Sequence, residues 1–335
     1  MVADPLAAFG VPVAPPAVRQ RLLRVSSLVD LARVLSPAYK RFVLRRSRGF
    51  VFHSPNYYLP PHDGPCVATF HDLSIFKWPE YHPVERVRYM QKELPVALAR
   101  AQMLIVDSAY TRAELIDYFG VEPSRVVDIP LAAQSIFGPM DCDATRPTLD
   151  ALGLVHGGYV LFVGTVEPRK NIEVLLNAYS MLAPAQRSRF PLVLAGYRGW
   201  RSEELLRRIS AAEQEGWARY YDYVDARHMP ALFAGARVFA FPSRYEGFGL
   251  PVLEALASAV PVVCSNAASL PEVAGGAAAL CDVDDVAGFA NAIDRALQDE
   301  EWRADAIRQG LAQSARFSWA ETARRTVDVY RAAAK

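Results

Sequence analysis

Short apolar runs alternate with amphipathic segments along most of this chain, and this alternation constrains its fold more than any other feature. The predicted strands of the first half are residues 49–53, 66–70, 103–106 and 126–129, with helical patterns near 84–100 and 110–119, the second led by Asp107-Ser108 as a cap candidate. The predicted strands of the second half are residues 159–163, 192–195, 220–224, 238–241, 261–263 and 278–281, each followed by a helical segment. Strands that alternate with such helices form parallel sheets, so the sequence predicts an α/β fold.

Length and composition favour two domains of this kind. The chain has 335 residues, of which 52% are hydrophobic, enough to bury two cores of ordinary size. Glycine, proline and acidic residues interrupt the periodicity at 138–150. We therefore predict a first domain over residues 1–140, a second over 141–318, and a final helix from about Trp319 to Ala334 within the segment 319–335.

Two glutamates, Glu246 and Glu254, lie eight positions apart around a predicted helix start. Between them, Gly249 lets the backbone approach a ligand closely, and Pro251 is a residue favoured at the first helical position. The N–H groups of Leu250–Leu253 are expected to form an anion site at the positive end of the helix dipole. Glu254, about one turn into the helix, can accept hydrogen bonds from vicinal hydroxyls. A phosphate flanked by two hydroxyl acceptors describes a sugar nucleotide.

A second phosphate element is predicted at residues 159–179, where an apolar strand leads through a Gly164 turn into an amphipathic helix. Arg169 and Lys170 fall at the junction, just before the expected helix cap Asn171. Open α/β sheets bind ligands at the carboxyl ends of their strands. A planar guanidinium beside an ammonium group suits a diphosphate there.

With both elements present, the chain resembles the retaining glycosyltransferases of family four, whose two Rossmann-like domains form the GT-B architecture. The motifs that carry the resemblance are G-T-V-E-P-R-K-N (164–171), A-G-Y-R-G-W (195–200), P-S-R-Y-E-G-F-G-L-P-V-L-E (242–254), A-T-F-H-D-L (68–73) and P-E-Y-H-P (79–83). The resemblance covers roughly residues 50–330. It implies two Rossmann-like domains, with the segment 319–335 crossing back to the first.

The resemblance also implies roles for individual residues. Glu254 would hold the ribose hydroxyls of the donor, and Glu246 would contact the transferred sugar. His71 would lie near the anomeric carbon and the acceptor, which makes Glu246 and His71 the expected catalytic residues. The residues implied in binding the donor diphosphate are Gly164, Arg169, Lys170, Phe248, Gly249 and Leu250.

Two histidines end predicted strands of the first half, where catalytic residues gather. His71 follows the strand 66–70, and a purely structural role is the alternative for it. His53 ends the preceding strand and is predicted, with less support, to lie on the acceptor side.

The expected reaction is transfer of a hexose, with retention of configuration, from a nucleotide diphosphate sugar to a glycan or lipid-linked acceptor. Similar enzymes are often mannosyl or deoxymannosyl transferases of surface polysaccharide assembly, such as lipopolysaccharide O-antigen, which favours a GDP-sugar donor. Two alternatives stay open, a nucleotide-sugar epimerase and a non-catalytic subunit that binds a sugar nucleotide.

No cofactor or metal is expected. The four cysteines are scattered without C-x-x-C spacing. The acidic triplets at 141–143 and 282–284 fall in a predicted linker and in a turn before a helix, and we reject both as metal clamps. Arg169 and Lys170 can supply the electrostatic stabilisation instead. A net charge of +1 gives no global attraction to nucleic acid.

The amino-terminal end differs from the family pattern. Family members carry a strand and a glycine-rich loop before the position of residues 50–60, whereas only 49 residues precede it here. We therefore expect the first strands to be missing, which makes activity of the chain as written uncertain. Residues 17–50 instead hold nine basic residues and one acid, a net charge of +8. A basic amphipathic segment is typical of membrane-surface contact, which would make this cytoplasmic protein peripheral on the inner face of the membrane. A solvated helix face is the alternative.

Overall fold

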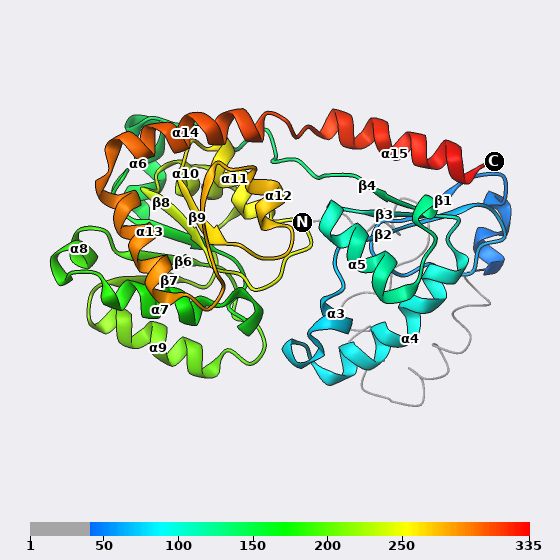
Figure 1. Ribbon diagram of the computed structural model, residues 1–335, viewed down its shortest axis with the longest axis horizontal. Coiled ribbons are helices and arrows are strands. Elements are labelled where there is room, and N and C mark those ends of the chain that lie inside the picture. Colours follow the sequence, from blue (N-terminus) through cyan, green and yellow to red (C-terminus); the bar gives the residue numbers. More distant parts are fainter. Residues whose placement is uncertain (1–40) are drawn as a thin grey trace.

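The computed structural model describes residues 41–335, which form two α/β lobes connected side by side (Figure 1). Each lobe is built on its own sheet, and every pairing of strands within both sheets is parallel. The predicted fold class, two Rossmann-like domains, is confirmed. The predicted absence of the first strands of the family concerns residues that lie outside the described range.

The first lobe holds a four-stranded sheet in the order β1-β2-β3-β4. Its strands are β1 (Phe52–Ser54), β2 (Cys66–Phe70), β3 (Met103–Val106) and β4 (Val126–Asp128). Its helices are α3 (Ser74–Lys77), α4 (Val84–Arg100) and α5 (Ala109–Phe119). The expected cap Ser108 is confirmed, because its Oγ accepts a hydrogen bond from the N–H of Thr111 at the start of α5.

The second lobe holds a six-stranded sheet in the order β10-β9-β8-β5-β6-β7. Its strands are β5 (Val160–Val163), β6 (Leu192–Ala195), β7 (Ala218–Tyr221), β8 (Val238–Phe241), β9 (Val262–Ser265) and β10 (Ala278–Cys281). Its helices are α6 (Cys142–Ala151), α7 (Ile172–Met181), α8 (Pro184–Arg189), α9 (Glu203–Gln214), α10 (Met229–Ala234), α11 (Leu250–Ala257), α12 (Leu270–Ala274), α13 (Val286–Gln298) and α14 (Glu300–Ser314). The strand order reverses between β5 and β8, which makes the crevice between them the topological switch point of this sheet.

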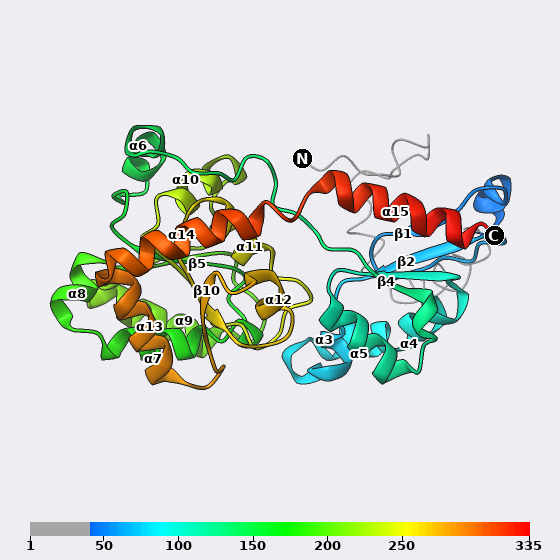
Figure 2. The same cartoon turned by 45° about the horizontal axis from the view of Figure 1, so that its top comes forward.

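The last helix, α15 (Trp319–Ala333), follows α14 and lies along the first lobe in both views (Figures 1 and 2). Successive side chains of a strand face opposite sides of its sheet. On β2, Ala68 and Phe70 accordingly join the core with α4, whereas Val67 joins a separate small core with Val329 of α15. The end of the chain therefore completes one face of the first sheet.

The predicted irregular linker at 138–150 is wrong, because most of it forms α6. Asp141 caps this helix by accepting from the N–H of Ala144, and Thr145 and Leu149 bury one face of it. The acidic residues and Pro147 suggested a loop, but one of those acids is the cap. Strand ends also moved by a few residues, for example from the predicted 220–224 to Ala218–Tyr221 in β7.

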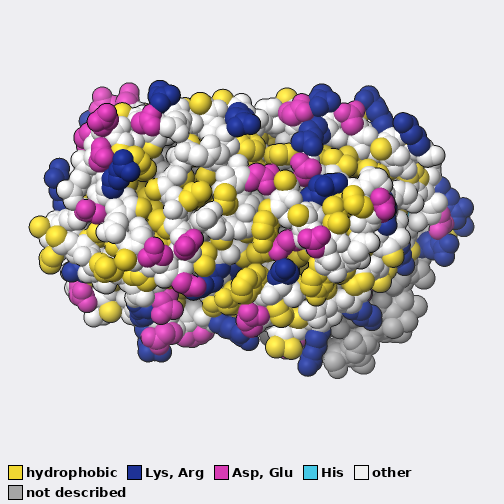
Figure 3. Space-filling model, viewed as in Figure 1, with side chains coloured by type: hydrophobic (Ala, Val, Ile, Leu, Met, Phe, Trp, Pro, Cys, Tyr) yellow, Lys and Arg dark blue, Asp and Glu magenta, His cyan; other side chains and the backbone are white. Residues whose placement is uncertain are grey.

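Acidic and basic side chains are interspersed over the face of the molecule in Figure 3, which agrees with the small net charge of the chain. Within residues 41–335, no helix is both long and apolar enough to cross a membrane. Most of the predicted basic segment, residues 17–40, lies outside the described residues. Its last part, residues 41–50, is at the surface of the first lobe.

Candidate active site

The predicted donor residues converge at the switch point of the second sheet. Gly164 directly follows β5, and the loop with Glu246 follows β8, so the two segments leave neighbouring strands at the same edge. A 3₁₀ turn, Pro168–Lys170, then places both cations against that loop. The topology therefore brings together two motifs that lie about 80 positions apart in the sequence.

Glu246 is the centre of a buried ion cluster. Its carboxylate lies 2.6 Å from Nζ of Lys170, 3.2 Å from Nη1 of Arg169 and 2.6 Å from Oγ of Ser243. Burial alone would raise the pKa of Glu246, but the two cations outweigh it and lower that pKa to about 2. Glu246 is therefore an anion at neutral pH and accepts from all three groups.

Arg169 and Lys170 are held rigidly in this cluster. The Arg169 guanidinium also donates to the carboxylate of Glu167 at 2.8 Å and to the carbonyl of Tyr245 at 2.6 Å. The Lys170 ammonium lies 5.1 Å from the ring centre of Phe241, a cation–π contact. Two cations thus face two carboxylates, which fixes their positions before any ligand arrives.

The predicted cap role of the Asn171 side chain is wrong. Asn171 begins α7 in a left-handed conformation, with φ of 55° and no capping hydrogen bond from its side chain. Its amide instead donates to the carbonyls of Pro242 and Val283, at 3.1 and 2.7 Å. These bonds attach the turn that carries Arg169 and Lys170 to the loops that follow β8 and β10.

The predicted anion site of four helix N–H groups also needs correction. Pro251 has no N–H, and the N–H groups of Val252 and Leu253 already donate to the carbonyl of Gly249. In the described part of the chain, the amides of Phe248, Gly249 and Leu250 have no recorded acceptor. Gly249 adopts φ of 113°, which disfavours any residue with a Cβ. The N–H groups that a ligand can use are therefore those of the glycine loop and of Leu250, the first residue of α11.

Glu254 lies in the first turns of α11 and differs in environment from Glu246. No ion-pair or hydrogen-bond partner for its carboxylate is recorded among residues 41–335. Burial without a counter-charge raises the pKa of Glu254 to about 7. A half-buried carboxylate without a partner is an acceptor open to a ligand.

His71 follows β2 and forms a pair that the sequence did not indicate. Its Nδ1 lies 2.8 Å from Oδ2 of Asp107, and its Nε2 lies 2.8 Å from the carbonyl oxygen of Pro55. The bond to Asp107 raises the pKa of His71 above its ordinary value, although burial opposes this. Asp107 had been identified only as a cap candidate beside Ser108.

His53 lies beneath α15, on the face of the first sheet that this helix covers. Its Nδ1 is 2.7 Å from the hydroxyl of Tyr330 and its Nε2 is 2.8 Å from Oγ1 of Thr69. Burial lowers the pKa of His53. Its ring therefore joins β1, β2 and the last helix, and a role on the acceptor side stays a prediction.

The loop that carries Glu246 is pressed against the first lobe. The carbonyl of Gly247 accepts from Oγ of Ser108 at 2.7 Å and from Oγ1 of Thr111 at 3.1 Å. A Cβ on Gly247 would lie only 1.7 Å from the carbonyl oxygen of His71. The donor motif and the histidine motif thus meet at the seam between the lobes.

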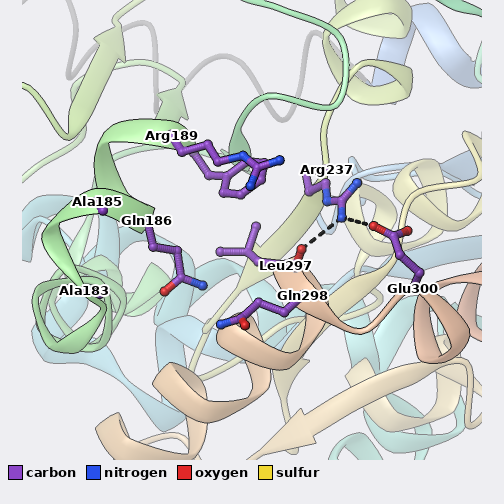
Figure 4. A pocket seen from close by; sticks show the side chains of 9 residues that line it. Ala183, Ala185, Gln186, Arg189, Arg237, Leu297, Gln298 and Glu300 are labelled. Carbon is purple, nitrogen blue, oxygen red and sulfur yellow. Dashed lines mark hydrogen bonds and ion pairs between the residues drawn. The ribbon is translucent and has the colours of Figure 1, made fainter.

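Two of the cavities lie at opposite edges of the second sheet, and a third, of about 300 Å³, is lined by Tyr81 of the first lobe with Pro168 and Arg244 of the second. The larger, about 520 Å³, is formed by residues of α8, α13 and α14 with Arg237, which precedes β8, and it lies at the amino ends of the strands (Figure 4). The other, about 250 Å³, lies at the carboxyl ends beside Gly164. Because ligands bind parallel sheets at the carboxyl ends, the smaller cavity belongs to the candidate site.

Three side chains around this smaller cavity had not been singled out from the sequence. Tyr197 and Tyr223 are exposed, with ring centres 5.6 Å apart. Asp222 uses Oδ1 to accept from the N–H of Arg198 and from the hydroxyl of Tyr220. All three follow the end of β6 or β7, and this position after a predicted strand could have indicated them from the sequence. That they line the same cavity depends on the pairing of β6 with β7, which the sequence does not give.

Three of the four acids in the two acidic triplets have structural partners. Asp141 caps α6, Asp143 pairs with Arg146, and Asp284 pairs with Arg244 at 2.6 Å. Over the described range 41–335, no group of three or more His, Cys, Asp and Glu side chains is arranged to hold a metal ion.

Two family models match the chain. Residues 155–313 match "Glycosyl transferases group 1", and residues 10–132 match "Glycosyltransferase Family 4". The matches fall on the two lobes separately, and the second-lobe match includes Gly164, Arg169, Lys170, Glu246 and Glu254.

The chain is also similar to individual proteins. It is 44% identical over 310 residues to the O-antigen chain mannosyltransferase B of Escherichia coli, covering 92% of this chain and 81% of that protein. It is 34% identical over 270 residues to the serotype-specific mannosyltransferase WbdA of Escherichia coli, covering 78% of this chain and 33% of that protein. This chain therefore spans about a third of the second relative.

Solved structures share the fold at low sequence identity. WaaG, a glycosyltransferase involved in lipopolysaccharide biosynthesis, superposes with a TM-score of 0.70 at 14% identity over 88% of this chain and 81% of that one. HepE of Anabaena, in complex with UDP and glucose, gives a TM-score of 0.68 at 20% identity over 79% of this chain and 71% of that one.

Proposed function

This chain belongs to the family 4 glycosyltransferases, and from that premise we propose that it transfers mannose, or a deoxymannose, from a GDP-sugar to a glycan acceptor with retention of configuration. The observation that carries the proposal is the pairing, at one switch point, of a fixed cation pair with a carboxylate that has no partner within residues 41–335. Arg169 and Lys170 suit a diphosphate, and Glu254 suits the vicinal hydroxyls of a ribose.

A guanine base is supported by the 250 Å³ cavity beside Gly164. Guanine presents two adjacent N–H donors on its pairing edge, and a carboxylate is an acceptor for both. Oδ1 of Asp222 is engaged with protein donors, whereas no partner is recorded for Oδ2 among residues 41–335. Tyr197 and Tyr223 offer aromatic faces for stacking at the same opening. Uracil has only one N–H on that edge and suits this arrangement less well.

We assign the remaining residues by the charge that develops during transfer. Negative charge builds on the leaving diphosphate as the sugar becomes oxocarbenium-like, and fixed cations with free amides stabilise it. The amides are those of Phe248, Gly249 and Leu250. Glu246, which holds Lys170, contacts the transferred sugar, and His71 donates a hydrogen bond near the reacting centre. Because these groups supply the stabilisation, we expect turnover to survive a chelator.

The donor proposal is tested by calorimetry with GDP and UDP. We expect GDP to bind at least tenfold more tightly, and Asp222→Asn to remove most of that difference, because one acceptor for the base is replaced by an N–H donor. Asp225→Asn, in the loop after β7, is the matched control. Equal affinities of the unaltered protein for the two nucleotides would contradict a guanosine donor.

The transfer itself is tested with GDP-mannose and a mannose-terminated oligosaccharide. The expected product carries one more sugar with the donor's anomeric configuration, detected by NMR spectroscopy. Conversion of the donor to an epimer without acceptor would support the epimerase alternative. Nucleotide binding without any turnover of mannosyl or deoxymannosyl donors would support the non-catalytic subunit.

We further propose that the enzyme contacts an anionic membrane through the basic segment 17–50. In the described part of that segment, Phe42 and Phe50 are 65% and 72% exposed, and the guanidinium of Arg45 lies 5.1 Å from the ring centre of Phe42. Basic and aromatic side chains together favour an anionic lipid surface. Salt should weaken the attraction, because exposed charges are screened within about 10 Å at 0.1 M.

Binding to vesicles of phosphatidylglycerol and phosphatidylcholine tests this contact. Replacing Arg41, Arg45, Arg46 and Arg48 by Gln should release the protein from the vesicles. The matched control replaces four exposed arginines elsewhere, Arg207, Arg308, Arg324 and Arg331. Equal binding by the two variants would leave the segment as a solvated surface.

A further inference from the structure

Asp107 is a buried carboxylate that the proposed chemistry has not used. It follows β3 and is only 3% exposed. It does not cap α5, because the adjacent Ser108 does so. In the described part of the chain, the recorded hydrogen bond of its carboxylate is the one to Nδ1 of His71, at 2.8 Å. A carboxylate is costly to bury, so a single specific partner indicates a specific task.

The surroundings of His71 define the state of its ring. Both groups that contact the ring nitrogens, the Asp107 carboxylate and the Pro55 carbonyl, can only accept. When Asp107 is ionised, both nitrogens therefore donate and the ring is an imidazolium. The ring of Tyr57 packs edge-on at 5.7 Å and restricts rotation. The other titratable groups nearby are Asp72, whose charge favours the imidazolium, and His53, which lies close enough to interact with it electrostatically.

We propose that Asp107 is a positioning residue for transfer, which fixes His71 with Nδ1–H bound to its carboxylate and presents Nε2–H as a donor to a substrate oxygen. This inference rests on the proposed function of His71. The Pro55 carbonyl occupies Nε2–H in the ligand-free protein, and the His71 side chain is 41% exposed, so a ligand oxygen can replace that carbonyl. The seam with Gly247 brings the donor loop to the same histidine.

A second consequence concerns pH. His71 acts here as a donor in its protonated form, so turnover should be lost as pH rises through its pKa. The carboxylate of Asp107 stabilises the imidazolium and moves that loss to higher pH. Asp107→Asn removes the charge and keeps the shape of the side chain, so the loss of turnover should move to lower pH. The Asn amide can also place an N–H donor against Nδ1, where the carboxylate accepted.

The first measurement is an NMR titration of His71 in the full chain, with isotope-labelled histidine. The chain contains six histidines, so a His71→Ala spectrum identifies the signal. We expect the His71 pKa to fall in Asp107→Asn and to stay unchanged in the control Asp117→Asn, an exposed residue on α5. This readout needs no turnover. An unchanged His71 pKa in Asp107→Asn would overturn the inference.

The second measurement is the pH profile of kcat with GDP-mannose. Asp107→Asn should lower kcat roughly 10–100-fold, as loss of an orienting partner commonly does, and shift the alkaline limb to lower pH. GDP affinity should stay within about twofold, and Asp107→Glu should recover part of the rate.

Equal loss at every pH, without a shift of the limb, would indicate a merely structural carboxylate and overturn the inference. If Asp107→Asn does not fold, Asp107→Ser, which also removes the charge, is judged by the same criterion. No transfer by the unaltered enzyme would instead defeat the proposed function.

Discussion

At the scale of single residues, the two glutamates of one motif have opposite electrostatic environments. Glu246 is surrounded by Lys170, Arg169 and Ser243, whereas no partner is recorded for Glu254 within residues 41–335. One carboxylate therefore stabilises the ligand-free protein and the other destabilises it. This difference gives each of them a distinct pH signature.

Glu246→Gln should destabilise the protein by about 3 kcal/mol at pH 7, because Lys170 stays buried without its closest counter-charge. The folded pKa of Glu246, about 2, lies below the unfolded value. Its contribution is therefore complete above an unfolded pKa of about 4.3 and is lost as pH falls toward 2. Denaturant unfolding from pH 7 to pH 3 should show the two proteins converging at the acid end.

The matched control for this change is Glu203→Gln, which removes one partner of the exposed pair Arg198–Glu203. Solvent screens that pair, so its loss should change stability little. Similar effects of the two substitutions would contradict the description of the Glu246 cluster as a buried network.

Glu254→Gln should have the opposite effect on the ligand-free protein. The folded pKa of about 7 lies above the unfolded value, so the native state binds the proton more tightly and loses stability as pH rises from about 4.5 through 7. The variant should thus be more stable than the unaltered protein at pH 8, by about 1–3 kcal/mol, and equal to it at pH 4. Thermal unfolding at both pH values measures this.

The same substitution should weaken GDP binding by about 1–2 kcal/mol, because an ionised acceptor for the ribose hydroxyls is lost. Glu301→Gln, an exposed position on α14, is the control for both measurements. A variant with higher stability at pH 8 and unchanged GDP affinity would remove Glu254 from the donor site.

At the scale of elements, short polar residues decide where helices of this fold begin. Ser108 starts α5, Asp141 starts α6 and Asp285 starts α13, each by accepting from a backbone N–H three residues on. By contrast, α11 begins at Leu250 and is preceded by Gly249, which has no side chain to cap it. That uncapped start leaves the amides of the glycine loop available where the donor is expected.

Asp141→Ala should destabilise the protein by about 1 kcal/mol, because α6 loses its cap and this helix packs on α10. Asp143→Ala, which removes only an exposed partner of Arg146, is the control and should change stability much less.

Neither substitution should create a dependence on added Mn²⁺. Thermal unfolding and an activity assay with chelator test both statements, and a manganese requirement in either variant would restore the metal clamp that we rejected.

At the scale of the whole molecule, the two lobes are joined by contacts that involve the candidate site itself. The hydroxyl of Tyr245 donates to Glu114 of α5 and accepts from the N–H of Leu73. The carboxylate of Glu272 accepts from the N–H groups of Ala109 and Tyr110, at 3.1 and 3.3 Å. We therefore expect closure of the lobes to assemble the site, as in an enzyme that excludes water during transfer.

Gly247→Ala should separate closure from donor binding. The added Cβ meets the carbonyl of His71, so the lobes cannot approach to the observed distance, while the second lobe keeps its own core. We expect kcat to fall about 100-fold, GDP to bind with little change, and the radius of gyration from X-ray scattering to increase.

Gly138→Ala is the matched control, since a Cβ there meets nothing within 4 Å. A Gly247→Ala protein that is as compact and as active as the control would show that this seam does not govern closure.

The sequence by itself determined the local features of this protein. Runs such as 192–195 and 238–241 are apolar throughout, because strands of a parallel sheet are covered on both faces, and both are strands in the structure. Asp107-Ser108 was identified as a helix start, and the glutamate and R-K-N motifs as ligand elements, because each depends on spacing within a few turns of chain.

Only the tertiary structure decided which distant groups meet. The contact between His71 and Asp107 joins residues 36 positions apart, and the contact between Lys170 and Glu246 joins residues 76 apart. Both contacts depend on which strands are neighbours, β2 beside β3 and β5 beside β8. The spacing of apolar residues predicts the strands themselves but carries no information about their order in the sheet. The cap at Asp141 was missed for a related reason, since the packing of α6 against α10 stabilises a helix that local composition disfavours.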